Sequence, residues 1–147
     1  MFDELGELYQ QVILDHSRSP RNYRPMAAAT ALAQGRNPLC GDQVTVYVQL
    51  EGDRISDVSF QGSGCAISKA SASLLTDQLK GRTPAEARSL CAHLRELVTT
   101  GKASTELGKL AVLSGVHKYP ARVKCAILPW HALLAALEGN AQPVSTE

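Results

Sequence analysis

The chain has 147 residues, of which 44% are hydrophobic and 20% charged, and its formal net charge is +1. This length and composition suit one compact core, so we expect a single domain over residues 1–147 with a frayed tail at 139–147. A nearly neutral chain lacks the basic field that draws proteins to nucleic acid or anionic lipid, so we expect neither as a partner. The sequence carries no signal-peptide pattern and no apolar run long enough to span a membrane, so we expect a cytoplasmic protein.

Helical and then alternating hydrophobic patterns open the chain. Apolar residues at helical spacing predict a first helix over about 2–16, which ends before the prolines of the following segment. Strict alternation from Val44 predicts a half-buried strand, and a turn at 51–53 leads into a second strand with imperfect alternation. We therefore expect an antiparallel hairpin over 44–61 and a third, weaker strand near 27–34.

The pattern changes to helix in the second half of the chain. Apolar residues mark one face over 66–79, and Gly81 gives this helix a natural stop. Thr83 precedes a proline and is followed three residues later by Glu86, which is the pattern of a capping box at a helix start. The resulting helix is expected to run to about residue 99.

Two more helices are expected, over 105–114 and about 121–138. Pro129 lies inside the last one and should kink it or push its regular start later. Strands that come first and helices that come after indicate an α+β fold, with helices packed on one face of a small three-stranded antiparallel sheet.

Three of the four cysteines and one aspartate lie where the chain changes direction. Cys40 and Asp42 precede the first hairpin strand, in a turn where Gly41 can adopt backbone angles that other residues avoid. Cys65 follows a glycine-rich strand-to-helix junction, where the first amides and the dipole of the helix favour a thiolate. Cys125 lies near the start of the last helix, where neighbouring cations also favour the thiolate.

The wide spacing of these residues excludes a compact zinc finger or ribbon, so the four side chains have to converge through folding. In a reducing cytoplasm they are expected as free thiols or metal ligands and not as disulfides. Three thiolates and one carboxylate suit tetrahedral Zn²⁺ and could equally hold iron bound to sulfide. Asp42 is the harder and weaker ligand, which indicates a site that exchanges ligands or opens.

The cysteines and the turn with Cys40 and Asp42 also have simpler interpretations. Cysteine is among the most buried residue types, and Cys91 fits that role because it lies on the apolar stripe of its helix. The turn with Cys40 and Asp42 could arise from an aspartate that only bonds to nearby backbone. Residue types and spacing alone leave these alternatives open.

Four segments of the sequence match the motifs of a known family: LYQQVILDHSRSPRN, NPLCGD, FQGSGCAISKASASLL and ARVKCAILPWHAL. Together they resemble the IscU/NifU-like family of iron–sulfur cluster assembly proteins, and most of all its SufU branch. Scaffold-type members typically carry a histidine before the third cysteine, where this chain has Lys124, and a chaperone-binding motif that HKYPARV replaces. These departures, and a lengthened region between Cys65 and Cys125, favour the SufU branch.

The resemblance implies a SufE/NifU-like α+β fold with a zinc site made of Cys40, Asp42, Cys65 and Cys125. It also implies an enzyme, a zinc-dependent sulfurtransferase whose Cys40 accepts persulfide sulfur from a SufS-type cysteine desulfurase. The sulfur would then pass to a downstream SUF scaffold or to apo-proteins. Arg122 is expected to support the transfer by orienting a freed carboxylate or persulfide through charge-assisted hydrogen bonds.

Two other functions stay open from the sequence. A non-enzymatic scaffold could assemble a [2Fe–2S] cluster across the same residues, because identical ligands serve zinc and iron. A purely structural zinc site would only support folding, and the weak carboxylate ligand argues against it.

Overall fold

The computed structural model describes residues 4–38, 41–139 and 144–145, and for residues 4–9 and 144–145 it describes the backbone alone. The helices and strands follow one another as α1 (Glu4–Arg18), β1 (Ala31–Asn37), β2 (Asp42–Glu51), β3 (Arg54–Ser63), α2 (Ala66–Leu79), α3 (Pro84–Thr100), the 3₁₀ segment η1 (Thr105–Lys118), α4 (Pro120–Leu137) and β4 (Val144–Ser145). Within these described ranges, no helix combines the length and the apolar character needed to cross a lipid bilayer.

Three antiparallel strands form the body of the sheet, in the order β3-β2-β1. Strands β2 and β3 form the predicted hairpin, and both extend about two residues beyond its predicted ends. Val44, Val46 and Val48 are buried on one face of β2, as their alternation with polar residues predicts. The antiparallel sheet of the predicted α+β fold is therefore confirmed.

Strand β1 begins later than the sequence pattern suggested, at residue 31 instead of near 27. Its inward-facing positions include Ala33 and Gly35, which give a weak hydrophobic signal because they are small. Small residues here let α4 pack closely over β1 and β2. The strand ends at Asn37, which pairs across the sheet with Asp42.

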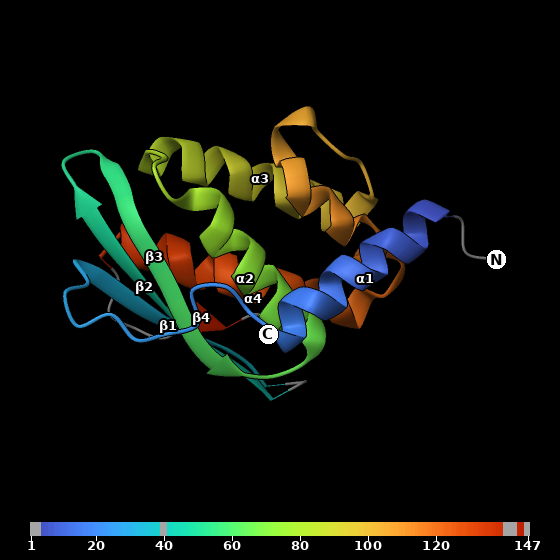
Figure 1. Ribbon diagram of the computed structural model, residues 1–147, viewed down its shortest axis with the longest axis horizontal. Helices are drawn as coiled ribbons and strands as arrows, with labels where there is room; N and C mark the ends of the chain where they lie inside the picture. The colour runs from blue at the N-terminus through green and yellow to red at the C-terminus, as the bar shows by residue number, and fades with distance from the viewer. Residues whose placement is uncertain (1–3, 39–40, 140–143, 146–147) are drawn as a thin grey trace.

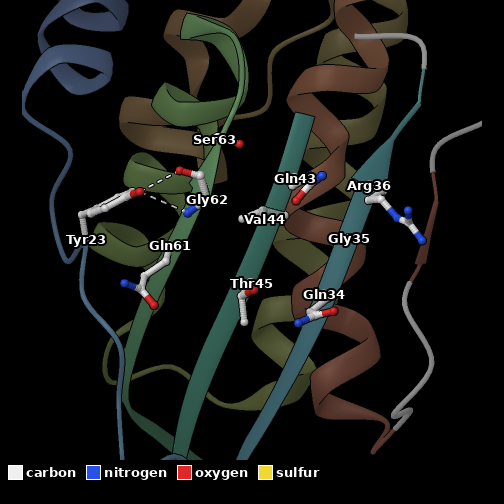
Figure 2. Close-up of a pocket in the computed structure, with 10 residues that line it drawn as sticks. All are labelled: Tyr23, Gln34, Gly35, Arg36, Gln43, Val44, Thr45, Gln61, Gly62 and Ser63. Carbon is white, nitrogen blue, oxygen red and sulfur yellow. Dashed lines mark hydrogen bonds between the residues drawn. The ribbon is translucent and has the colours of Figure 1, made fainter. Parts of the chain in front are cut away.

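The helices gather on one face of the sheet (Figure 1). Helix α4 packs against β1 and β2, α2 packs against β3, and α1 and α3 contact the sheet through these inner helices. The opposite face carries polar side chains: Gln34, Thr45 and Gln61 come from three neighbouring strands and line a shallow groove of about 490 Å³ (Figure 2). Tyr23 closes one side, where its hydroxyl donates to the Gly62 carbonyl at 2.6 Å.

Helices α2 and α3 begin and end close to the predicted residues. The predicted capping box is present, since the Thr83 side chain accepts from the Glu86 amide and the Glu86 carboxylate accepts from the Thr83 amide. Gly101 ends α3 in the left-handed region at φ 81°, which is the usual helix end. Cys91 lies on the buried side of α3 and belongs to the hydrophobic core, as its place on the apolar stripe predicts.

Two predictions about the C-terminal half need correction, and the tail contributes a short strand. The helix expected over 105–114 is a 3₁₀ segment that reaches residue 118, and Gly108 interrupts it with φ 53° and ψ −126°. Helix α4 begins at Pro120 and is continuous through Pro129, so the proline does not delay its regular start. In the tail expected to fray, β4 pairs with β1 in parallel, and residues 140–143 and 146–147 lie outside the described residues.

A short chain of buried hydrogen bonds fixes α2 against α4. The indole N–H of Trp130 donates to the Ser71 hydroxyl at 3.1 Å, and that hydroxyl donates to the Ala126 carbonyl at 2.6 Å. These bonds fix the register of the two helices, with the second turn of α2 beside the second and third turns of α4.

Candidate metal centre

The aspartate of the C-G-D turn lies at the first position of β2. Gly41 adopts φ 72°, a conformation that other residues rarely take, and its N–H donates to the Asn37 carbonyl at 2.9 Å. This turn carries Asp42 into the interior, where it is fully buried. A buried carboxylate needs partners that compensate for its lost hydration.

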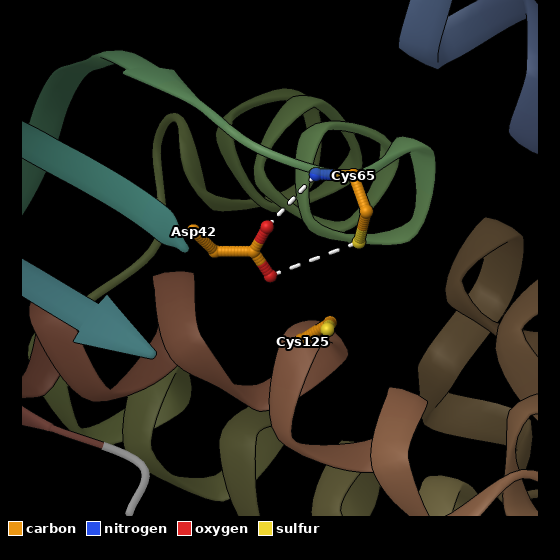
Figure 3. A group of neighbouring side chains, drawn as sticks. All are labelled: Asp42, Cys65 and Cys125. Carbon is orange, nitrogen blue, oxygen red and sulfur yellow. Dashed lines mark hydrogen bonds between the residues drawn. The ribbon is translucent and has the colours of Figure 1, made fainter. Parts of the chain in front are cut away.

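Cys65 supplies two of these partners. Its backbone N–H donates to Asp42 Oδ1 at 2.8 Å, and its Sγ lies 3.7 Å from Asp42 Oδ2 (Figure 3). The same cysteine is the N-cap of α2, and its sulfur accepts from the Ser68 amide at 3.5 Å. An amide at a helix start favours a negatively charged sulfur, as the sequence position of Cys65 predicts.

Two glycines of the QGSGC segment make room for this contact. A Cβ added at Gly64 would overlap the Asp42 carboxylate, and a Cβ added at Gly62 would overlap the backbone of Gln43. The glycines are therefore needed for close approach as well as for the turn into α2. The sequence alone does not indicate this role for either residue.

Cys125 completes the group from the other side. It is fully buried on α4, and its Sγ lies 3.7 Å from the Ala121 carbonyl of the preceding turn. The buried side-chain amide of Asn37 donates to the same sulfur at 3.8 Å. Asn37 is thus a neighbour of the site that the sequence analysis missed, although it stands three residues before the cysteine of the NPLCGD segment.

One ligand atom from each of Asp42, Cys65 and Cys125 lies within 4.8 Å of the other two. Tetrahedral zinc with Zn–S near 2.3 Å would place neighbouring ligands roughly 3.8 Å apart, so a small contraction brings this group to bonding distance. Two sulfurs and one carboxylate oxygen also match the ligand types that zinc prefers. The described side chains therefore fit a zinc ion and leave one tetrahedral position for a fourth ligand.

Cys40 lies outside the described residues, so the structure does not place the predicted fourth ligand. Arg122 is exposed at the start of α4, one turn before Cys125. The charge of the Cys65 and Cys125 thiolates and their hydrogen bonds with Arg122 raise the pKa of its guanidinium. Because Arg122 is exposed and interacts with both sulfurs, it lies at the mouth of the group. Cys91 stands apart in the core, where burial raises its pKa to about 11.

A model of the NifU-like N-terminal domain matches residues 8–126 of the chain. The chain belongs to this family. The membership agrees with the four segments of the sequence that resemble IscU/NifU-like proteins, and the matched range contains all the proposed ligands.

The relatives carry two different functional names. The chain is 39% identical to the iron–sulfur cluster assembly scaffold protein IscU of Streptococcus pyogenes serotype M1 over 94% of this chain and 87% of the relative. It is 41% identical to the zinc-dependent sulfurtransferase SufU of Bacillus subtilis strain 168 over 88% of each. A solved SufU structure from Fervidobacterium islandicum AW-1, described as a scaffold of the SUF system, superposes with a TM-score of 0.83 at 36% identity, covering 89% of this chain and 97% of that one.

Proposed function

We propose that this protein works in iron–sulfur cluster assembly as a zinc-dependent sulfurtransferase that accepts sulfur from a SufS-type cysteine desulfurase. The observation that carries the proposal is the convergence of Asp42, Cys65 and Cys125 beside the connection that contains Cys40. Three protein ligands and a fourth from a short connection suit a site that can exchange that ligand. A relative named as a zinc-dependent sulfurtransferase supports the same function.

Zinc bound by this group would keep the thiols deprotonated at neutral pH and protect them from oxidation. Asp42, Cys65 and Cys125 would hold the ion, since each is anchored to a different part of the fold. Cys40 belongs to the connection between β1 and β2, which starts after Asn37 and ends at Asp42. A ligand on a short connection can leave the group while the other three stay in place.

The transfer step uses Cys40 as the nucleophile. The desulfurase presents a persulfide on its own cysteine, and the Cys40 thiolate attacks the outer sulfur. The new bond joins that sulfur to Cys40, the sulfur–sulfur bond of the donor breaks, and its electron pair leaves with the desulfurase thiolate. Arg122, at the mouth of the group, would stabilise the negative charge of the Cys40 persulfide by charge-assisted hydrogen bonds.

A desulfurase assay tests the proposal. The rate of alanine release by a SufS-type desulfurase is measured with this protein in its zinc-loaded and zinc-stripped forms. We expect stimulation by the zinc-loaded form only, and its loss in Cys40→Ala without loss of folding by circular dichroism. Equal rates with and without zinc, or full stimulation by Cys40→Ala, would rule out the proposed role.

The second candidate is a scaffold for a [2Fe–2S] cluster that is passed to apo-proteins. The observation in its favour is the 39% identity to a protein named as such a scaffold, together with a ligand set that also suits iron. Anaerobic incubation with iron and sulfide distinguishes the two functions. A stable visible absorption followed by efficient cluster transfer to an apo-ferredoxin would favour the scaffold.

A further inference from the structure

Helices α3 and α4 enclose an apolar groove of about 230 Å³ away from the proposed metal ligands. Its floor contains Cys91, Ile127, Trp130 and Leu134. Successive residues of an α-helix are rotated by about 100° around its axis. Ile127 comes two residues after Cys125, so the two side chains point to nearly opposite sides of α4. The groove therefore belongs to a different surface of the protein from the metal centre.

The rim of the groove is cationic. Arg88 and Arg95 are exposed two helical turns apart on α3, and within the described part of the chain neither makes an ion pair with a carboxylate. Arg95 lies 3.3 Å from Nε2 of His131, and burial together with Arg95 lowers the pKa of that imidazole. The histidine therefore presents a neutral acceptor to Arg95 and leaves both guanidinium charges for an external partner.

We propose that this groove docks an acidic amphipathic helix of a partner protein. Side chains of α3 line one wall of the groove and side chains of α4 line the other, which is the arrangement that helix-in-groove recognition uses. One or two apolar side chains of the partner would enter the floor, and carboxylates one or two turns apart would pair with Arg88 and Arg95. The volume is below the roughly 300–1,000 Å³ of small-molecule pockets, which fits anchoring side chains better than a whole cofactor.

The proposal does not depend on the sulfurtransferase activity, because the groove and the metal ligands share no residue. A partner docked there would not cover the group of Asp42, Cys65 and Cys125, which lies on the other side of α4. The protein could then hold a second protein while it accepts sulfur.

Fluorescence anisotropy with two labelled peptides tests the docking site on the zinc-loaded protein. The first peptide is an amidated helix of about 16 residues with leucine on one face and glutamate on its flanks, and the second has lysine in place of each glutamate. We expect the glutamate peptide to bind, the lysine peptide not to bind, and binding to weaken at high salt. Equal binding of the two peptides, or no binding of the glutamate peptide, would overturn the proposal.

Surface variants assign the binding to the groove. The double variant Arg88→Glu/Arg95→Glu should bind the glutamate peptide at least about tenfold more weakly. The matched control Arg18→Glu/Lys102→Glu changes the net charge equally at exposed positions outside the groove and should bind as the parent does. Ala92→Glu, which places a charge at the exposed edge of the floor, should also weaken binding.

Three results would contradict the assignment. Unchanged binding by the Arg88→Glu/Arg95→Glu variant would place the peptide elsewhere, and so would an equal loss in the control variant. A dimer seen by sedimentation that dissociates in the groove variant would show that a second copy of this chain occupies the groove. Zinc content measured in every variant should stay unchanged, which separates this surface from the metal centre.

Discussion

Both carboxylate oxygens of Asp42 face Cys65: Oδ1 accepts the backbone N–H of Cys65 at 2.8 Å, and Oδ2 lies 3.7 Å from its sulfur. One oxygen of the carboxylate therefore fixes the start of α2, and the other is directed toward the proposed metal position (Figure 3). The residue has a structural role in addition to the ligand role that the sequence suggested.

Asp42 variants separate these two roles. Asp42→Ala removes the acceptor for the Cys65 amide, so we expect a loss of about 1–3 kcal/mol in the free energy of unfolding, together with faster zinc release. Asp42→Asn keeps an acceptor oxygen, so it should lose less stability but still release zinc faster than the parent. Chemical denaturation and competition with a colourimetric chelator measure the two effects.

The exposed residue Asp53 provides the control for Asp42, since it lies in the turn between β2 and β3. Asp53→Ala should change neither zinc release nor the free energy of unfolding appreciably. Zinc release from Asp42→Ala at the parental rate would contradict the ligand role of this carboxylate.

Gly64 should tolerate no side chain, because an added Cβ would overlap the Asp42 carboxylate. We expect Gly64→Ala to lower the free energy of unfolding by about 1–3 kcal/mol and to weaken zinc binding, since the carboxylate has to move. Gly115→Ala is the matched control, because its added Cβ would meet no atom within 4 Å. Equal zinc affinity and stability in the two variants would show that the close approach has no importance for the site.

Cys91 should be unreactive in the folded protein. Burial raises its pKa to about 11, so at pH 8 the thiol stays protonated, and only 9% of the residue is exposed, at the floor of the groove between α3 and α4. We expect iodoacetamide to leave Cys91 unmodified until the protein is unfolded in guanidinium chloride, as mass spectrometry of the digested peptides can show. Rapid alkylation under native conditions would contradict its place in the core.

The same pKa shift gives Cys91 a contribution to pH-dependent stability. In the unfolded chain the thiol ionises near ~8.5, so above that pH the folded state holds one more proton than the unfolded state. The free energy of unfolding should therefore decrease as the pH rises from about 8.5 towards 11, and Cys91→Ala should show a smaller decrease.

His16 should make the protein less stable in mild acid. The ring is buried at the end of α1, its Nδ1 lies 2.7 Å from the Ser73 hydroxyl, and burial together with Arg21 lowers its pKa. The unfolded chain binds a proton near ~6.5, and the folded ring does so only at a lower pH. The contribution of His16 to the free energy of unfolding is therefore present above ~6.5 and is lost as the pH falls below it. His16→Asn should reduce the slope of the unfolding free energy between pH 7 and pH 5, and an unchanged slope would contradict the assignment.

The elements with a strong period or a local capping signal could be predicted from the sequence. Alternating valines gave the hairpin, and the reciprocal bonds of Thr83 and Glu86 gave the start of α3. The hydrophobic pattern does not mark the start of β1, because the inward residues of this strand are small and are selected by packing against α4. The 3₁₀ character of η1 depends on the backbone of Gly108, which a hydrophobic pattern does not report.

Within the candidate site, residue types predicted the ligands and three-dimensional packing supplied their neighbours. The thiols and the carboxylate stood out because metals need them, and three of the four proposed ligands do converge. Asn37 gave no such signal, since an asparagine before a proline is ordinary in a turn. Asn37 and Cys125 are 88 positions apart in the chain. They come together only because α4 packs over β1.

The most direct test of the account is mass spectrometry of Cys40 after a single turnover with a SufS-type desulfurase and cysteine. The zinc-loaded protein is alkylated, digested and searched for peptides with one additional sulfur. We predict that the sulfur appears on Cys40 and is absent from Cys91. No sulfur on Cys40, while the desulfurase is still stimulated, would contradict the proposal that this protein is the sulfur acceptor.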